Sequence, residues 1–279
     1  MEVVGSLDTY VDFFRHYPIQ EVWVLLLLTL ARIVPIIALT PFLGGTVLPD
    51  PMKLGFSVAL APIFFPFILV HSSGALPNSI DILFMALLVK EVLIGALLGF
   101  LISIPYYFCQ SAGVLIDHQS GGQSLQVTDP STQSQASPTG LLYNNMMLVI
   151  FFAIGGHLLF FEAVANSYKL VPVDQFLSAS FFSHTTPLWH FLIKLLTTFT
   201  TIAVQLAAPS LIALLMSDLF LGIANRMAPQ VQISFLMWSF KSYVGIALLW
   251  AGWWFILKQI EVQGLDWIKI VTHLVEGFH

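Results

Sequence analysis

Charged side chains are scarce in this sequence of 279 residues. Lysine and arginine number 10 and aspartate and glutamate 15, so that 9% of the chain is charged. Soluble proteins average about 25%. So few charges cannot cover a water-soluble globule, which excludes an ordinary soluble enzyme. The net charge of −5 and the lack of a basic stripe also exclude a protein that binds nucleic acid through its phosphates.

Cysteine is almost absent as well. The single Cys109 cannot form an internal disulfide, and its apolar surroundings predict a packing role. The N-terminus has no basic start, because Glu2, Asp8, Asp12 and Glu21 outnumber the one basic residue before the first apolar run. We therefore expect no cleavable signal peptide, and expect that run to remain in the mature protein.

Motifs for catalysis or cofactor binding are weak or missing. There is no HExxH motif and no phosphate-binding P-loop. His157 and Glu162 lie five residues apart on an apolar stretch, and we interpret His157 as a packing histidine. Asp117 and His118 are adjacent and so do not share a helix face. The sequence predicts no enzyme activity, no cofactor and no metal site.

Hydrophobic residues, in contrast, make up 57% of the chain, with a mean hydropathy of +0.87. They form six apolar stretches, at residues 22–48, 54–70, 82–116, 141–161, 185–217 and 231–257. A helix that crosses the hydrocarbon of a bilayer needs about 20 apolar residues. This pattern predicts an all-α, polytopic membrane-type bundle.

Proline and glycine interrupt these stretches. The short second stretch carries Pro62 and Pro66, which favours a bent or re-entrant pair over a full span. Pro35, Pro105 and Pro209 lie inside other stretches. We therefore expect bent helical hairpins packed on protein rather than straight anchors.

Five charged residues lie inside the apolar stretches: Arg32, Lys90, Glu91, Lys194 and Lys241. Charges at this depth are costly and usually have partners. Lys194, and less clearly Lys241, suit a side chain that reaches a helix end. Arg32 and Lys90 lie well inside their stretches, so we expect each to have a partner, with Glu91 or Asp218 as candidate counter-charges. Lys90 and Glu91 point in different helical directions and are not expected to need each other. A transporter would use such residues as an ion path, and an assembly subunit would use them as clamps.

A polar window at residues 119–143 separates the third and fourth stretches. It holds one charge, Asp129, among many glutamines and serines, and no helical or strand periodicity is visible. One interpretation is a disordered linker. Disordered linkers usually carry charge, however, and this window carries almost none. The other interpretation is therefore a loop folded into a neutral polar cavity, such as a channel plug.

Several spaced motifs together resemble one known family. The resemblance runs from about Arg32 to Lys241 and rests on these residues, in chain order: Arg32, Pro35, Pro41, Phe42, Pro49, Lys53, Glu91, Gly95, Gly99, Ala112, Gly113, Asp117, Gln119, Gly121, Asp129, Pro130, Gly156, His157, Pro209, Asp218, Gly222, Arg226, Pro229, Gln230 and Lys241. In order and spacing they resemble the type III secretion export-apparatus family SctT, whose flagellar counterpart is FliR.

The resemblance implies a single export-gate domain over residues 1–279, with a C-terminal tail at 258–279. One copy would join several copies of two smaller membrane proteins in a helical, hetero-oligomeric pore for unfolded secreted proteins, and a switch protein would pack near its entrance. The gate would lie in the bacterial inner membrane, largely raised towards the periplasm. A stand-alone secondary transporter or channel is the alternative.

The resemblance also implies roles for individual residues. The plug loop would comprise Asp117, Gln119, Gly121, Gly122, Gln123, Gln126, Asp129 and Pro130. Assembly and packing would depend on Arg32, Pro35, Lys90, Glu91, Gly95, Gly99, Asp218, Arg226, Pro229, Gln230 and Lys241. The Gly95–Gly99 spacing allows close approach of helices. Pro229 and Gln230 are expected in a turn, with Arg226 near the end of the preceding helix.

Overall fold

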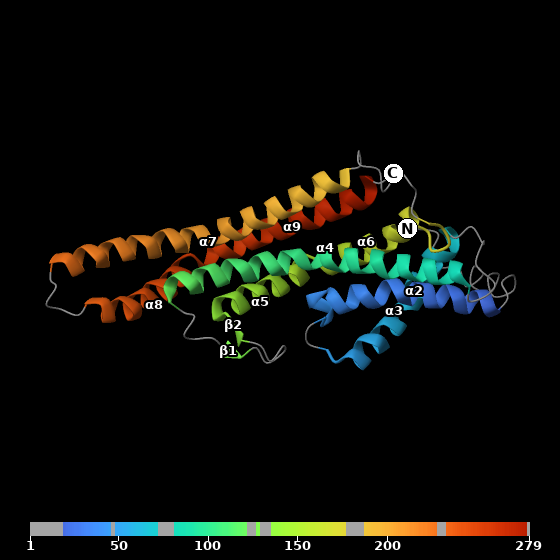
Figure 1. Ribbon diagram of the computed structural model, residues 1–279, viewed down its shortest axis with the longest axis horizontal. Coiled ribbons are helices and arrows are strands. Elements are labelled where there is room, and N and C mark those ends of the chain that lie inside the picture. Colours follow the sequence, from blue (N-terminus) through green and yellow to red (C-terminus); the bar gives the residue numbers. More distant parts are fainter. Residues whose placement is uncertain are drawn as a thin grey trace. The chain divides into compact units, whose positions relative to one another are not determined.

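The computed structural model describes residues 19–45, 48–71, 81–121, 127–128, 135–176, 187–227 and 233–277. These residues are almost entirely helical (Figure 1). The helices are α2 (Ile19–Leu39), the 3-10 turn η1 (Pro41–Leu43), α3 (Asp50–His71), α4 (Ile82–Ser120), α5 (Pro138–Ala153), α6 (Gly156–Leu170), α7 (Pro187–Met227), α8 (Ile233–Ala251) and α9 (Trp253–Gly277). Two strands, β1 (Val127–Thr128) and β2 (Gln135–Ala136), form a short antiparallel pair. The all-α prediction is confirmed.

The chain forms two compact units. Unit 1 contains residues 1–103, 157–186 and 268–279, and unit 2 contains residues 104–156 and 187–267. Helix α4 contributes to both units, and the division falls next to Pro105, which cannot make the helical hydrogen bond of its missing N–H. Of the polar networks described below, one lies in unit 1 and two lie in unit 2.

Two of the predicted stretches break into helix pairs at glycine. α5 ends and α6 begins next to Gly155, whose φ of 74° is a left-handed conformation that favours glycine. α8 and α9 meet at 64° around Gly252. The second stretch was predicted wrongly as a bent or re-entrant pair, because Asp50–His71 forms the single helix α3.

The boundaries of the polar window and of the tail also differ from the prediction. α4 continues to Ser120, and α5 begins at Pro138, so the window is helical at both ends. Ser137 caps α5 by accepting a hydrogen bond from the Gly140 N–H, and Pro138 suits the first helical turn. The tail predicted at 258–279 is helical to Gly277, because its apolar residues recur at helical spacing and Ile256, Ile260 and Trp267 are buried.

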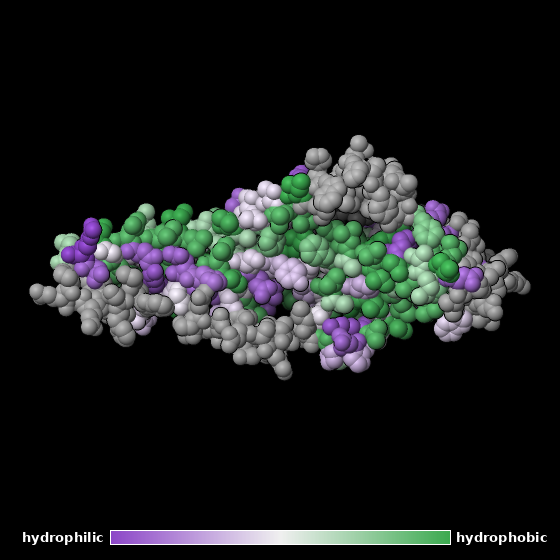
Figure 2. Space-filling model, viewed as in Figure 1, coloured by the Kyte–Doolittle hydropathy of each residue, from purple (hydrophilic) through white to green (hydrophobic). Residues whose placement is uncertain are grey.

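Several helices are long and apolar enough to cross a membrane. Within the described part of the chain, three qualify alone, and as many as five do if each bent pair is one span. Large apolar side chains are exposed on most helices, and Figure 2 shows apolar residues over much of the coloured surface. Such exposure is unfavourable in water. The chain is an integral membrane protein.

Candidate functional site

In unit 1, α2 and α4 come into backbone contact along a glycine face. A Cβ on Gly95 would collide with the Arg32 carbonyl, and one on Gly99 would lie 3.1 Å from the Ile36 Cα. Glu91, Gly95 and Gly99 recur every four residues and so share one face of α4. The glycines bring the helices together, and the Glu91 carboxylate thereby faces Arg32.

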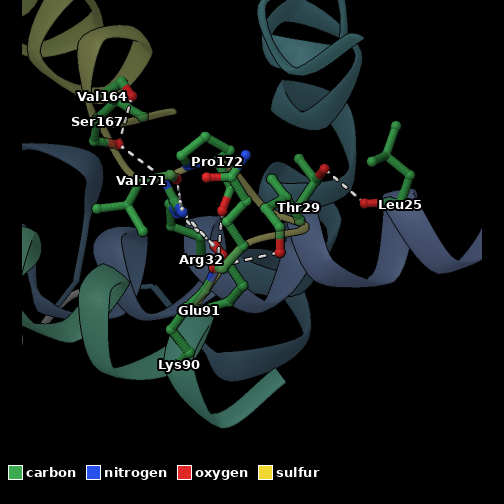
Figure 3. Close-up of polar contacts among 11 residues, drawn as sticks. Leu25, Thr29, Arg32, Lys90, Glu91, Val164, Ser167, Val171 and Pro172 are labelled. Carbon is green, nitrogen blue, oxygen red and sulfur yellow. Dashed lines mark hydrogen bonds and ion pairs between the residues drawn. The ribbon is translucent and has the colours of Figure 1, made fainter. Parts of the chain in front are cut away.

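Arg32 and Glu91 form a buried bidentate ion pair (Figure 3). The Arg32 Nε donates to Glu91 Oε2 at 2.5 Å, and Nη2 donates to Oε1 at 2.9 Å. Both side chains are 0% exposed. The planar guanidinium matches a carboxylate with two parallel hydrogen bonds, which lysine cannot do. Arg32 therefore has the partner that the sequence predicted.

The remaining Arg32 contacts reach α6 and the segment that follows it. Nη1 donates to Ser167 Oγ at 3.2 Å, and Nη2 donates to the Val171 carbonyl at 2.8 Å. The guanidinium carbon lies 4.1 Å from the ring centroid of Tyr168, in a cation–π arrangement. One side chain of α2 thus joins α4 and α6.

Lys90 completes this network. Its Nζ lies 2.7 Å from Glu91 Oε1 and donates to three backbone carbonyls, those of Pro172 (2.9 Å), Val173 (3.1 Å) and Gln175 (2.8 Å). The expectation that Lys90 and Glu91 need not pair was wrong, because the long lysine stem bends back around the helix to the neighbouring carboxylate. The two cations therefore share one carboxylate, and their remaining hydrogen bonds go to the Ser167 hydroxyl and to carbonyl oxygens between Val171 and Gln175.

In unit 2, Asp117 near the end of α4 holds the start of α5. Its carboxylate accepts hydrogen bonds from Ser137 Oγ (2.5 Å), Thr139 Oγ1 (2.5 Å) and the Thr139 N–H (2.9 Å). Asp117 is 7% exposed, and a carboxylate is favourable at the positive end of a helix dipole. The chain leaves α4 and re-enters α5 at this point, so Asp117 closes the base of the polar window.

A second close approach supports this base. A Cβ on Gly113 would collide with the backbone of Thr139 and Gly140. Helices α4 and α5 therefore touch through glycine one turn before Asp117. Only glycine fits this contact without displacing a backbone.

A smaller network joins the end of α4 to α7 and α8. Gln119 Nε2 donates to Asp218 Oδ2 at 3.0 Å, and Asp218 forms an ion pair with Lys241. Asp218 is thus a counter-charge, as predicted, but for Lys241. Lys241 was also considered as a side chain that reaches a helix end. The structure instead gives it an ion-pair partner, Asp218 on α7.

The other predicted residues fall in different places. Pro35 lies inside α2, and Arg226 is exposed in the last turn of α7. Gly121 follows α4 with a φ of 78°. Cys109 is buried and free. Predictions for Gly122, Gln123, Gln126, Asp129, Pro130, Pro229 and Gln230 lie outside the described residues.

Sequence reasoning missed the partners that carry no charge. Ser137, Thr139 and Ser167, together with the carbonyls of 171–175, complete the networks. A serine before Pro138 is a helix-start signal that could have identified Ser137. Among the described residues, no group of three or more His, Cys, Asp or Glu side chains could hold a metal ion.

Comparison with known proteins assigns the chain to one family. The family model described as "Bacterial export proteins, family 1" matches residues 23–264, a range that contains every contact above. The chain belongs to this bacterial export protein family. It is the SctT/FliR family that the spaced motifs predicted, now matched along most of the chain.

Individual members of the bacterial export protein family show the same likeness. The chain is 36% identical over 166 residues to "Yop proteins translocation protein T" of Yersinia pestis, which covers 59% of this chain and 62% of that protein. It is 27% identical to "Surface presentation of antigens protein SpaR" of Shigella flexneri, over 78% of this chain and 80% of that one. It is 30% identical to "Flagellar biosynthetic protein FliR" of Bacillus subtilis, over 74% and 77%.

Proposed function

We propose that this protein is a subunit of the export gate of a bacterial type III secretion system, in the inner membrane. The observation that carries the proposal is the family match over residues 23–264. Relatives named for protein translocation and for flagellar biosynthesis both resemble the chain, which favours a shared part of the export apparatus. The subunit has a structural role and no catalytic one.

The buried networks support a clamp role over an ion path. Arg32 and Lys90 bind a carboxylate and backbone carbonyls of the same unit, which ties helices and a connecting segment together. A path for ions or protons needs groups that can release their partners. A clamp suits a chain that takes its place among partner subunits, which we propose are the two smaller membrane proteins of the gate, beside its switch protein.

We further propose that the segment between Gly121 and Ser137 plugs the gate, which lies raised towards the periplasm and passes unfolded proteins. Asp117, near the end of α4, holds the end of this segment through Ser137 and Thr139. Hydroxyl and amide contacts contribute about 0.5–1.5 kcal/mol each net, so they can hold a closed state and still yield to an incoming chain. Ion pairs in a dry seal would be harder to release.

The role in export is tested by deleting the gene for this protein and measuring the amount of secreted protein. The same measurement is made after the gene is returned on a plasmid. A gate subunit predicts loss of secretion and its restoration. A stand-alone transporter predicts normal secretion together with solute uptake by liposomes that contain the purified chain alone. That result would overturn the proposal.

The plug is tested by shortening the segment. Replacing residues 129–134 by Asn-Gly leaves β1 and β2 to be joined by a two-residue turn. We expect an assembled gate that leaks small molecules. A same-length replacement by Gly and Ser serves as the control for composition. A shortened gate that assembles and stays as tight as the parent would contradict the plug role.

A further inference from the structure

Helix α7 is too long to lie wholly in a bilayer. Its apolar candidate span covers 35 residues, Ile193–Met227, or about 52 Å at 1.5 Å per residue. The hydrocarbon core is about 30 Å thick. Part of this helix therefore lies outside the hydrocarbon unless it is strongly tilted, and its exposed side chains indicate which part.

The exposed face of α7 changes character near Pro209. Before it, polar and apolar residues are mixed, and the exposed polar ones are Lys194, Thr197, Thr200, Thr201 and Gln205. Lys194 and Gln205 carry the groups that hydrocarbon disfavours most. After it, the large exposed side chains up to Ile223 are all apolar: Ile212, Leu215, Met216, Leu219, Phe220 and Ile223. Asn225 and Arg226 then follow, both exposed.

The exposed face of α8 and α9 changes in the same way at the bend around Gly252. Among residues 239–251 of α8, the part whose side chains the structure describes, the large exposed residues are Phe240, Tyr243, Ile246 and Trp250. Trp253, Trp254 and Phe255 follow the bend, and then Lys258, Glu261 and Asp266 are exposed. The apolar stripe of α9, with Ile256 and Ile260, is already buried. Beyond Phe255, the exposed residues of α9 include these three charged ones together with Val262 and Ile270, so its outward face is mixed.

The two changes occur at the same level. α7 and α8 are consecutive and pack together (Figure 1), and the Asp218–Lys241 ion pair fixes their antiparallel register. In that register Pro209 lies level with Trp250. One plane, close to Gly252, therefore separates an apolar exposed surface from one on which polar and apolar residues are mixed.

We infer that the hairpin from Pro209 to Gly252 is the part of unit 2 that lies in the hydrocarbon of the bilayer, with the tryptophans of the α8–α9 bend at one boundary. The 19 residues of α8 extend about 28 Å, close to the thickness of the hydrocarbon core. Trp250, Trp253 and Trp254 are exposed at the end of this span, where tryptophan anchors membrane proteins. The polar N-terminal half of α7 and helix α9 then lie beyond the boundary.

Lipid fits this surface better than a partner helix does. A partner helix would need to cover the apolar face over a length equal to one bilayer thickness, and would need to end at the same plane on both helices. The hydrocarbon core of a bilayer meets both conditions, because it has that thickness and a flat boundary. α8 and α9 are therefore not one bent span: α8 lies in hydrocarbon, and α9 runs on outside it. The inference does not rest on the proposed function, because it concerns only whether lipid, water or protein surrounds each exposed side chain.

The experiment places a nitroxide label at five positions, one at a time, in a Cys109→Ala background that removes the one native cysteine. Leu219→Cys and Ile246→Cys lie inside the proposed band, and Thr201→Cys and Lys258→Cys lie beyond it. The chain is purified with whatever subunits accompany it and placed in phosphatidylcholine–phosphatidylglycerol nanodiscs. Collisions with oxygen report hydrocarbon, and collisions with a nickel chelate report water.

We expect a several-fold higher ratio of oxygen to nickel collisions at 219 and 246 than at 201 and 258. A label at Trp254→Cys falls between the two groups. Labels at 219 and 246 that meet neither reagent would show that protein covers the hairpin. Labels there that meet nickel would show water. Either result overturns the inference, and neither bears on whether the chain supports secretion.

Discussion

Arg32 and Glu91 lie 59 residues apart in the chain and form a bidentate ion pair whose side chains are both 0% exposed. The pair exists because Gly95 and Gly99 let the backbones of α2 and α4 touch. Ser167 and Val171 accept further hydrogen bonds from the same guanidinium. Unit 1 is therefore stabilised at a point where three helices meet.

Arg32→Ala should lower the recovery of the folded chain and of its complex. It leaves the Glu91 carboxylate buried beside Lys90 alone, and breaking one partner of a buried pair costs about 3–5 kcal/mol. Recovery after purification in mild detergent is the measurement. Permeation through any gate that still assembles should change less than recovery does.

The double variant Arg32→Met with Glu91→Met serves as the control. Removing both charges is often neutral, because no uncompensated charge remains. We expect better recovery from it than from Arg32→Ala. A normal yield from Arg32→Ala would contradict the clamp.

Asp117→Ala should loosen the base of the polar window. The carboxylate accepts three hydrogen bonds from Ser137 and Thr139, and bonds to charged groups contribute about 1.5–3 kcal/mol each. We expect an assembled gate that leaks small molecules. Thr139→Ser, which keeps the hydroxyl, should stay tighter than Thr139→Val. Equal tightness of all three variants would show that Asp117 does not position the segment.

Gly113→Ala should destabilise unit 2, because its methyl group would collide with the backbone of α5. Overpacking of this kind costs about 1–3 kcal/mol. Gly222→Ala is the matched control, since a Cβ there meets nothing within 4 Å and alanine favours a helix by about 1 kcal/mol. Thermal unfolding in detergent should separate the two variants. A stable Gly113→Ala protein would contradict the contact between α4 and α5.

Asp218→Asn and Lys241→Gln should each weaken the register of the α7–α8 hairpin, and a double-mutant cycle should give a coupling of about 0.2–1 kcal/mol. The two side chains are partly exposed, at 28% and 18%. Thermal unfolding of the parent, the two single variants and the double variant in detergent provides the measurement. Strict additivity of the two substitutions would show that they do not interact.

The sequence allowed the helices and the charged partners to be predicted, because both follow from the cost of exposed polar groups in an apolar surrounding. Arg32 required a carboxylate, and the sequence left Glu91 and Asp218 as the two candidates, of which the structure shows Glu91. The family could also be recognised from the order of short motifs. What connects Lys90 to the segment at 171–175 is backbone oxygen, which every residue carries. No sequence pattern marks such acceptors.

Boundaries were harder to predict for a related reason. The window from Gln119 to Tyr143 looks uniform in composition, but the Ser137 cap and Pro138 begin a helix inside it. The last apolar stretch in the sequence also ends at Leu257, whereas helix α9 continues beyond it. The helix continues because its apolar residues, such as Ile260 and Trp267, are buried against the rest of the protein. Local signals and tertiary burial determine such limits, and composition averages over them.

The composition of the purified complex tests the central proposal most directly. The chain is tagged, extracted in mild detergent and analysed by native mass spectrometry with identification of its companions. A gate subunit predicts one copy of this chain together with several copies of two smaller membrane proteins. A monomer or homodimer that carries a solute across liposome membranes would contradict it.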